Sequence, residues 1–251
     1  MSVPSPILSE LRKTVLSIEG NARDHGDVMP FGMSELDGRL AGGGLRLDAL
    51  HEVAGRNASW ADDAAALLFI SGIAARLEGS VLWVLRSRDL FAPGLYQAGL
   101  DPDRVIYAEA QNDIELLAIV EEGLRHGGLA AVVGEAKRMS TTATRRLQLA
   151  AAEGKTLALM LKRPAKKDED AFAMPSAAMS RWKVSQAPSV PVPWGGLGPA
   201  CWRLACVRQR GGNPFELVVE APDETGRIAL PAELVDRPAA SGGASAYIAA
   251  A

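Results

Sequence analysis

The fold is decided by one stretch of sequence, Phe31-Gly32-Met33-Ser34-Glu35-Leu36-Asp37-Gly38-Arg39-Leu40-Ala41-Gly42-Gly43-Gly44-Leu45. A short helix containing Leu36 and Asp37 is expected first. The three glycines Gly42 to Gly44 follow a helix and precede a strand, so they are interpreted as a helix-to-strand turn and not as a phosphate-binding loop. The next segment, residues 50–54, is predicted to be the first strand of the core.

After that strand, the chain alternates between helix-forming and strand-forming segments. The helical segments carry apolar residues at intervals of three or four, and the strand segments are short apolar runs. The expected helices are 61–77, 93–98, 113–125 and 140–153, and the expected strands are 81–85, 105–108, 129–133 and 156–161. This alternation predicts an α/β fold, with a mainly parallel sheet covered by helices on both faces.

The pattern changes after residue 161. Residues 162–180 are charged, contain proline and have no period, so a mobile loop is expected there. Three strand-like segments follow, at 181–187, 200–210 and 215–220, and Gly211-Gly212-Asn213 is the clearest turn between them. These segments predict an antiparallel C-terminal extension of the sheet.

The two ends of the chain are expected to lie outside the core. Three parts are expected: an N-terminal helix with its linker at 1–30, the core at 31–235, and a flexible tail at 236–251. The N-terminal helix and the tail each carry apolar side chains that are candidates for contact with a partner. These are Leu8, Leu11, Val15 and Ile18 in the helix, and Tyr247 and Ile248 in the tail.

Composition excludes several classes of function. The 251 residues carry a net charge of −3, so the chain lacks the basic excess typical of proteins that bind nucleic acid tightly by themselves. Cys201 and Cys206 have no second pair of cysteines, so no zinc site, other metal or cofactor is expected. The first ten residues do not form a signal peptide, and no apolar run approaches the about 18 residues of a membrane span. A cytoplasmic protein without membrane contact is expected.

The opening stretch resembles the start of a RecA-like core, in which the first strand leads directly into the phosphate-binding loop. Residues 81–96 and the strands at 181–220 resemble later parts of that core, so the resemblance covers residues 31–220. The segment Leu50-His51-Glu52-Val53 is most similar to the ImuA family, the RecA-related member of a damage-induced mutagenesis cassette. The resemblance implies a role in SOS-induced translesion DNA synthesis, with an ImuB-like protein and an error-prone polymerase.

The residues that would bind ATP are missing from the segment that corresponds to the phosphate-binding loop. Such a loop has the form G-x-x-x-x-G-K-[ST], in which amides, Lys and a hydroxyl hold the phosphates and magnesium. Here the second Gly, the Lys and the Ser/Thr are absent, Trp60 is expected to crowd the phosphates, and Asp62 and Asp63 are expected to repel them. The aligned sequence is Gly55-Arg56-Asn57-Ala58-Ser59-Trp60-Ala61-Asp62-Asp63.

Two further determinants of ATP hydrolysis are also missing. The position of the acid that activates water corresponds to Arg88, with Asp89 adjacent as a candidate substitute. The strand-end Asp that supports magnesium corresponds to Gly134, and Glu135 follows it. Glu135 is interpreted as a solvated loop carboxylate, with metal contact as the alternative. Because preorganised charges supply much of the catalysis of phosphoryl transfer, no catalytic residue and no enzymatic activity are expected.

Two other groups of residues have competing interpretations. Lys162, Arg163, Lys166 and Lys167 lie where the family places a DNA-contacting loop, so weak, salt-dependent binding of single-stranded DNA is one interpretation. The other is a solvated loop balanced by the acids at 168–170. His51 is interpreted as a structural or sheet-edge residue, because no base or nucleophile pairs with it.

The main hypothesis is a non-catalytic adaptor that contacts RecA or an ImuB-like protein, or both, and so helps to recruit an error-prone polymerase. One alternative is a divergent ATPase or recombinase that holds phosphate with Arg56, Arg86 or Arg88. Another is an inhibitor that caps RecA filaments. Self-association stays open, and fold analogy alone does not choose among these functions.

Overall fold

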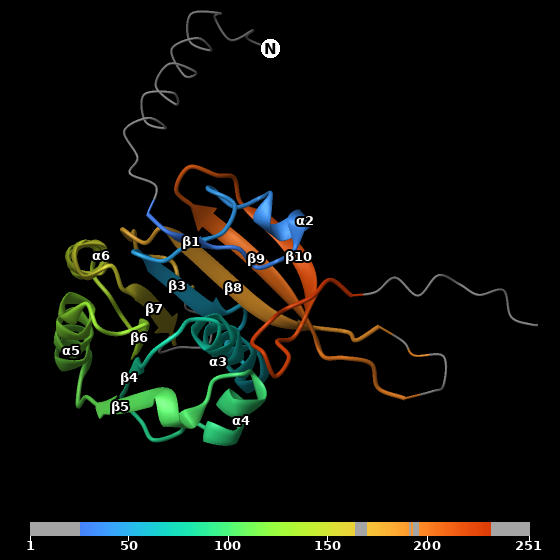
Figure 1. Cartoon of the computed structure of the whole chain (residues 1–251), viewed down its shortest axis with the longest axis horizontal. Helices are drawn as coiled ribbons and strands as arrows, with labels where there is room; N and C mark the ends of the chain where they lie inside the picture. Colours follow the sequence, from blue (N-terminus) through green and yellow to red (C-terminus); the bar gives the residue numbers. More distant parts are fainter. Residues whose placement is uncertain (1–25, 164–169, 191, 193–195, 232–251) are drawn as a thin grey trace, which may run out of the picture.

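The computed structural model describes residues 26–163, 170–190, 192 and 196–231. Eight strands form the main sheet, and their bounds are β3 Leu50–Gly55, β4 Val81–Leu85, β5 Val105–Glu109, β6 Ala131–Ala136, β7 Leu157–Lys162, β8 Ser180–Ala187, β9 Cys201–Gln209 and β10 Phe215–Glu220. Their spatial order is β10-β9-β8-β3-β7-β6-β4-β5 (Figure 1). The strands from β8 to β5 run parallel, whereas β9 and β10 run antiparallel to their neighbours. The mainly parallel sheet and its antiparallel extension are therefore confirmed.

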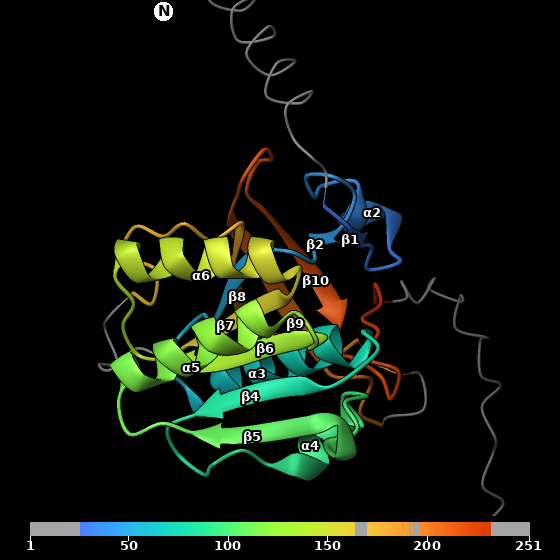
Figure 2. The ribbon, with the colours of Figure 1, turned by 60° about the vertical axis from the view of Figure 1, so that its left-hand side comes forward.

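Helices cover both faces of the sheet, as the alternation of segments predicts. They are α3 Trp60–Ala75, α4 Ala92–Gln97, α5 Asp113–His126 and α6 Thr141–Gly154, with a short 3-10 helix η1 at Pro102–Arg104. Figure 2 shows α5 and α6 side by side on one face, with α3 behind the sheet. The side chain of Asn112 caps α5 by accepting two backbone amides, and Gly127 ends the helix with a φ of 69°.

The opening stretch folds around the side chain of Asp37. Its carboxylate accepts the backbone amides of Phe31, Gly32 and Met33, and so fixes the turn into α2 Ser34–Asp37. After α2, the glycine turn leads into a strand, but this strand is the short β2 Leu45–Arg46, which precedes the predicted strand at 50–54. The strand β1 Val28–Met29 pairs antiparallel with β2, so paired structure begins before the expected boundary at residue 31.

Aromatic packing joins this opening unit to the main sheet. Phe31 stacks on Phe69 of α3, with ring centroids 6.1 Å apart, and both rings contact Trp182 of β8. Phe215 of β10 meets Trp182 edge-on at 5.8 Å. Because aromatic pairs bury large areas in a fixed geometry, this cluster holds the two ends of the described chain on one core. Both cysteines are free and buried in β9, which agrees with a structural role.

Two boundaries differ from expectation in ways that affect the site. Strand β6 continues through Glu135 to Ala136, so Glu135 is a strand residue and not a loop residue. Strand β7 ends at Lys162 and β8 begins at Ser180, so both ends of the expected loop at 162–180 belong to the sheet. Charged residues inside buried strands break the apolar pattern, and the interactions described below explain why they are tolerated. Within the described ranges, no helix is both long and apolar enough to cross a bilayer.

Candidate functional site

The loop between β3 and α3, where the phosphate-binding segment is expected, is closed by a side chain of its own. The carboxylate of Asp62 accepts the backbone amide of Asn57 at 3.1 Å and its side-chain amide at 2.8 Å. The other carboxylate oxygen of Asp62 accepts the backbone amide of Gln186 at 3.1 Å. The side chain of Ser59 caps α3 by accepting the amide of Asp62. Asp62 is only 5% exposed, so an internal anion already occupies this helix start.

Trp60, which is expected to crowd the phosphates, is the first residue of α3 and is 87% exposed, so it does not pack inside the loop. The carboxylate of Asp62 lies there, bound to the amides of Asn57. Space at Gly55 is tight, because a Cβ at this position would lie 3.1 Å from backbone atoms of Asp62 and Asp63.

Arg56, the first variable residue of the loop, is turned toward the antiparallel end of the sheet. Its guanidinium donates to Glu216 of β10 at 2.6 Å, and Arg203 of β9 donates to the other oxygen of Glu216 at 2.9 Å. Hydrogen bonds from Arg56 and Arg203 lower the pKa of the Glu216 carboxyl. These ion pairs lie at the surface, so they orient Arg56 more than they stabilise the fold.

A buried carboxylate lies at the end of β6, beside the position expected for a magnesium-supporting acid. Glu135 is 6% exposed, so its interpretation as a solvated carboxylate is wrong. It accepts the indole N–H of Trp83 at 2.9 Å and an ion pair from Arg163 at 3.1 Å. Burial raises the pKa of Glu135, while Arg163 and Trp83 act in the opposite direction.

Arg163 also reaches Asp89, which accepts its guanidinium at 2.8 Å. One cation therefore links Asp89, which follows β4, to Glu135, which lies near the end of β6. Asp63 lies within the electrostatic reach of Arg163, and burial raises the pKa of its carboxyl. Among the described residues, no group of three or more His, Cys, Asp or Glu side chains is arranged to hold a metal ion.

The arginines available for unconventional phosphate contacts are engaged with carboxylates. Arg86 donates to Asp113 at 3.1 Å, and Arg88 forms an ion pair with Glu109. The structure also changes the interpretation of the DNA-contacting cations, because Lys162 is 5% exposed in β7 and Arg163 faces Glu135 and Asp89. Several candidate residues lie outside the described residues: Lys166, Lys167, Leu8, Leu11, Val15, Ile18, Tyr247 and Ile248.

His51 is buried in β3, near the middle of the sheet, so its alternative placement at a sheet edge is wrong. Its Nε2 donates to the carbonyl of Arg46 at 2.8 Å, which leaves Nδ1 to accept the hydroxyl of Ser180 at 2.6 Å. The Ser180 oxygen in turn accepts the indole N–H of Trp182. When His51 is neutral, each polar atom in this series of hydrogen bonds has a partner. Burial lowers the pKa of His51 to about 4.

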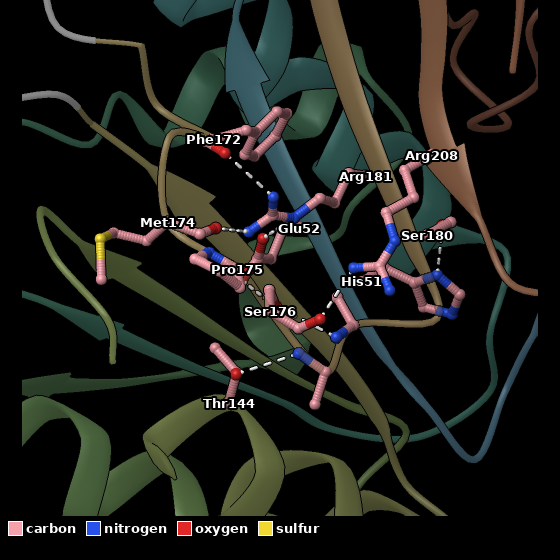
Figure 3. Close-up of polar contacts among 12 residues, drawn as sticks. His51, Glu52, Thr144, Phe172, Met174, Pro175, Ser176, Ser180, Arg181 and Arg208 are labelled. Atoms are coloured by element: carbon pink, nitrogen blue, oxygen red, sulfur yellow. Dashed lines mark hydrogen bonds and ion pairs between the residues drawn. The ribbon is translucent and has the colours of Figure 1, made fainter. Parts of the chain in front are cut away.

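A buried ion pair between Glu52 and Arg181 joins β3 to β8 (Figure 3). The two side chains are register partners, and the guanidinium donates to the Glu52 carboxylate at 2.7 Å. Arg181 also donates to the carbonyls of Phe172 and Met174, and Ser176 donates to Glu52 at 2.7 Å. The pair thus holds residues 170–179 against the sheet. Sequence reasoning missed it, although a Glu inside a core strand was a usable signal.

The fold and the closed loop define a class of protein: an α/β protein with a mainly parallel sheet, in which an internal carboxylate fills the loop after the first core strand. No protein-family model matches the chain. It is 37% identical over 229 residues to Protein ImuA of Caulobacter vibrioides, in strain NA1000 / CB15N and in strain ATCC 19089 / CIP 103742 / CB 15. The alignment covers 88% of this chain and 93% of each relative, so the chain belongs to the ImuA family.

Among solved structures, SulA from Pseudomonas aeruginosa matches part of the chain. The TM-score is 0.38 with 22% sequence identity, and the match covers 44% of this chain and 94% of SulA.

Proposed function

We propose that this chain is a non-catalytic adaptor with a RecA-like core that acts in SOS-induced translesion DNA synthesis. Membership of the ImuA family supports a place in the damage-induced mutagenesis cassette. The observation that carries the non-catalytic part is the hydrogen bonding of Asp62 to the amides of Asn57 and Gln186. The carboxylate of Asp62 occupies the backbone amide of Asn57, which a bound phosphate would need as a donor.

The electrostatics of this edge of the sheet support the same conclusion. A bound triphosphate would have to displace the Asp62 carboxylate from its donors and would approach the second carboxylate, Asp63. It would gain no Lys from the loop, because Arg56 is the loop's cation and pairs with Glu216. Charge repulsion and lost hydrogen bonds both oppose nucleotide binding.

Metal-assisted hydrolysis is disfavoured by the position of Arg163. Its guanidinium contacts Glu135 and Asp89, the two carboxylates nearest the expected magnesium and catalytic-acid positions. A cation supplied by the chain therefore balances these acids. Displacing it would leave a positive charge partly buried without its partners, which is costly.

The divergent-ATPase alternative requires Arg56, Arg86 or Arg88 to contact phosphate. Each of these arginines would first have to leave a carboxylate partner, namely Glu216, Asp113 or Glu109. The adaptor is therefore the better-supported function. Its proposed partners are RecA, an ImuB-like protein, or both, and the polymerase would be recruited indirectly.

A pull-down of the tagged full-length chain from DNA-damaged cells, with captured proteins identified by mass, tests the adaptor role. We expect RecA or an ImuB-like protein in the captured fraction. Leu11→Asp with Val15→Asp is expected to reduce capture of RecA, and truncation after Val235 to reduce capture of the ImuB-like protein. Capture of neither protein by the parent chain would contradict the adaptor role. RecA capture with loss of filament assembly in vitro would favour the inhibitor.

A further inference from the structure

One edge of the main sheet is formed by β5, a strand with a single neighbour among the described strands. Strand β5 pairs with β4 on one side, and within the described part of the chain no strand lies on its other side. Its sequence, Val105 to Glu109, contains no Pro, Lys or bulge, the devices that usually protect an edge strand from pairing with other chains. The opposite edge differs, because Glu220 of β10 forms a bridge with Ala229 and Glu216 carries two arginine contacts.

The free edge exposes apolar side chains on both faces of the sheet. Ile106 is 52% exposed and Tyr107 is 45% exposed. Tyr107 is the register partner of Trp83, which packs in the core under α3, so Tyr107 lies on the α3 face. Ile106 pairs with Leu82, which packs against the core under α5 and α6. Covering this edge would bury apolar surface above and below an added strand.

Exposed aromatic residues lie beside the same edge. Phe91 and Tyr96 are 69% and 65% exposed, at the start and within α4. Figures 1 and 2 both place α4 next to β5. Aromatic residues are enriched at protein interfaces because they bury large areas at a small cost in conformational entropy.

The outward backbone groups of β5 can be assigned. The amide of Ala110 donates to Leu85 of β4, so it points toward β4. Because amide directions alternate along a strand, the amides of Val105, Tyr107 and Glu109 point away from β4. These groups are the donors that an added strand would use.

Charge at the edge decides what kind of strand fits. Asp101 and Asp103 are exposed just before β5, and Glu109 is exposed at its end, where it pairs with the exposed Arg88, so this edge carries three acids and one paired arginine. Arg104, which lies between them, donates its guanidinium to three backbone carbonyls at and after the end of α3. An antiparallel second copy would place this edge against another edge of the same net negative charge, and like charges opposite each other are unfavourable.

We propose that the β5 edge binds an extended segment of a different protein, with alternating apolar side chains flanked by basic residues. Main-chain hydrogen bonds to β5 would supply affinity, and the apolar and basic side chains would supply specificity. The proposal rests on the adaptor function and names the surface and chemistry of its partner. It can fail while the adaptor function stands, because an adaptor can bind through another face.

The test uses the full chain and two synthetic peptides of about ten residues. Both peptides share a core of alternating Val and Thr, and their ends carry Lys in one and Glu in the other. Fluorescence anisotropy measures binding to the parent, to Tyr107→Pro and to Tyr107→Lys. Tyr107→Pro removes an outward amide without a partner in β4, so the β4 ladder is expected to survive. Val218→Lys, at a half-exposed position of β10, is the matched control.

We expect the Lys-flanked peptide to bind at least about tenfold tighter than the Glu-flanked peptide at low salt. Both Tyr107 variants should lose at least about tenfold in affinity, and Val218→Lys should bind like the parent. Slower hydrogen exchange at the Tyr107 amide in the parent complex gives a readout that survives if a variant fails to fold. Equal binding of both peptides, unchanged binding by the Tyr107 variants, or a dimer of the parent that Tyr107→Lys dissociates would overturn the proposal.

Discussion

The carboxylate of Asp62 accepts both the backbone and the side-chain amide of Asn57, at 3.1 and 2.8 Å, inside the loop that follows the first core strand. The same carboxylate accepts the amide of Gln186 near the end of β8, so it also ties the loop to a neighbouring strand. A carboxylate of the chain itself therefore holds this loop in place.

Asp62→Ala is expected to destabilise the fold by about 2–4 kcal/mol, because three donors lose a charged acceptor in a buried place. The free energy of unfolding from urea denaturation measures the effect. Asp63→Ala is the matched control, since burial raises the pKa of Asp63 and its charge gains little in the folded state. The control should stay within about 0.5 kcal/mol of the parent. Equal effects of the two variants would show that Asp62 does not close the loop.

Arg181→Met is expected to cost about 3–5 kcal/mol, because it leaves the buried Glu52 carboxylate without its cation. The double variant Glu52→Gln with Arg181→Met should recover part of that loss, since no unpaired charge remains. Chemical denaturation of the single and double variants gives the coupling between the two residues. A double variant as unstable as the sum of the single variants would show that the two residues do not act as a pair.

Unfolding is expected to depend on pH through His51. Burial lowers the pKa of folded His51 to about 4, below the value of 6.5 expected in the unfolded chain. The unfolded state thus binds more protons between these values, so the stability present above pH 6.5 falls as the pH drops to about 4. Asp48 and Arg46 are the charged groups that act on His51, in opposite directions.

His51→Gln isolates this contribution, because glutamine can hydrogen-bond but does not titrate. The parent should be the more stable of the two at pH 7, and its advantage should shrink by about 3 kcal/mol by pH 4. A stability difference that stays constant across this range would contradict a neutral, buried His51.

Arg163→Met is expected to destabilise the fold more at pH 7 than at pH 5. Without Arg163, burial raises the pKa of Glu135 further, so the folded state favours the protonated acid and loses stability as the pH rises. Thermal unfolding at both pH values measures the effect. Adding Glu135→Gln should remove most of the pH dependence. If the single variant shows no such dependence, Glu135 does not rely on Arg163.

The sequence predicted the class of the sheet and the helices on both faces because apolar periodicity reports burial directly. Strand ends were harder to predict: Glu135 and Lys162 look like loop residues by polarity, yet Trp83 and Arg163 allow Glu135 to remain inside β6. The apolar pattern also does not report side-chain direction. We therefore expected Trp60 to crowd the loop, whereas the buried side chain there is Asp62.

Contacts between residues far apart in the chain could not be predicted at all. The register that pairs Glu52 with Arg181 joins positions 129 residues apart, and no local period encodes it. The absence of the phosphate-binding residues, by contrast, is a local property of residues 55–63, and it was readable without a structure.

Titration with Mg²⁺-ATP shows whether the loop between β3 and α3 can bind nucleotide. The full-length chain should show no heat of binding by isothermal titration calorimetry and no change in Tm at millimolar nucleotide, because Asp62 already holds the amides of Asn57 and Gln186. A Tm rise of several degrees that depends on nucleotide concentration would mean that ATP binds the folded state, and would contradict the account.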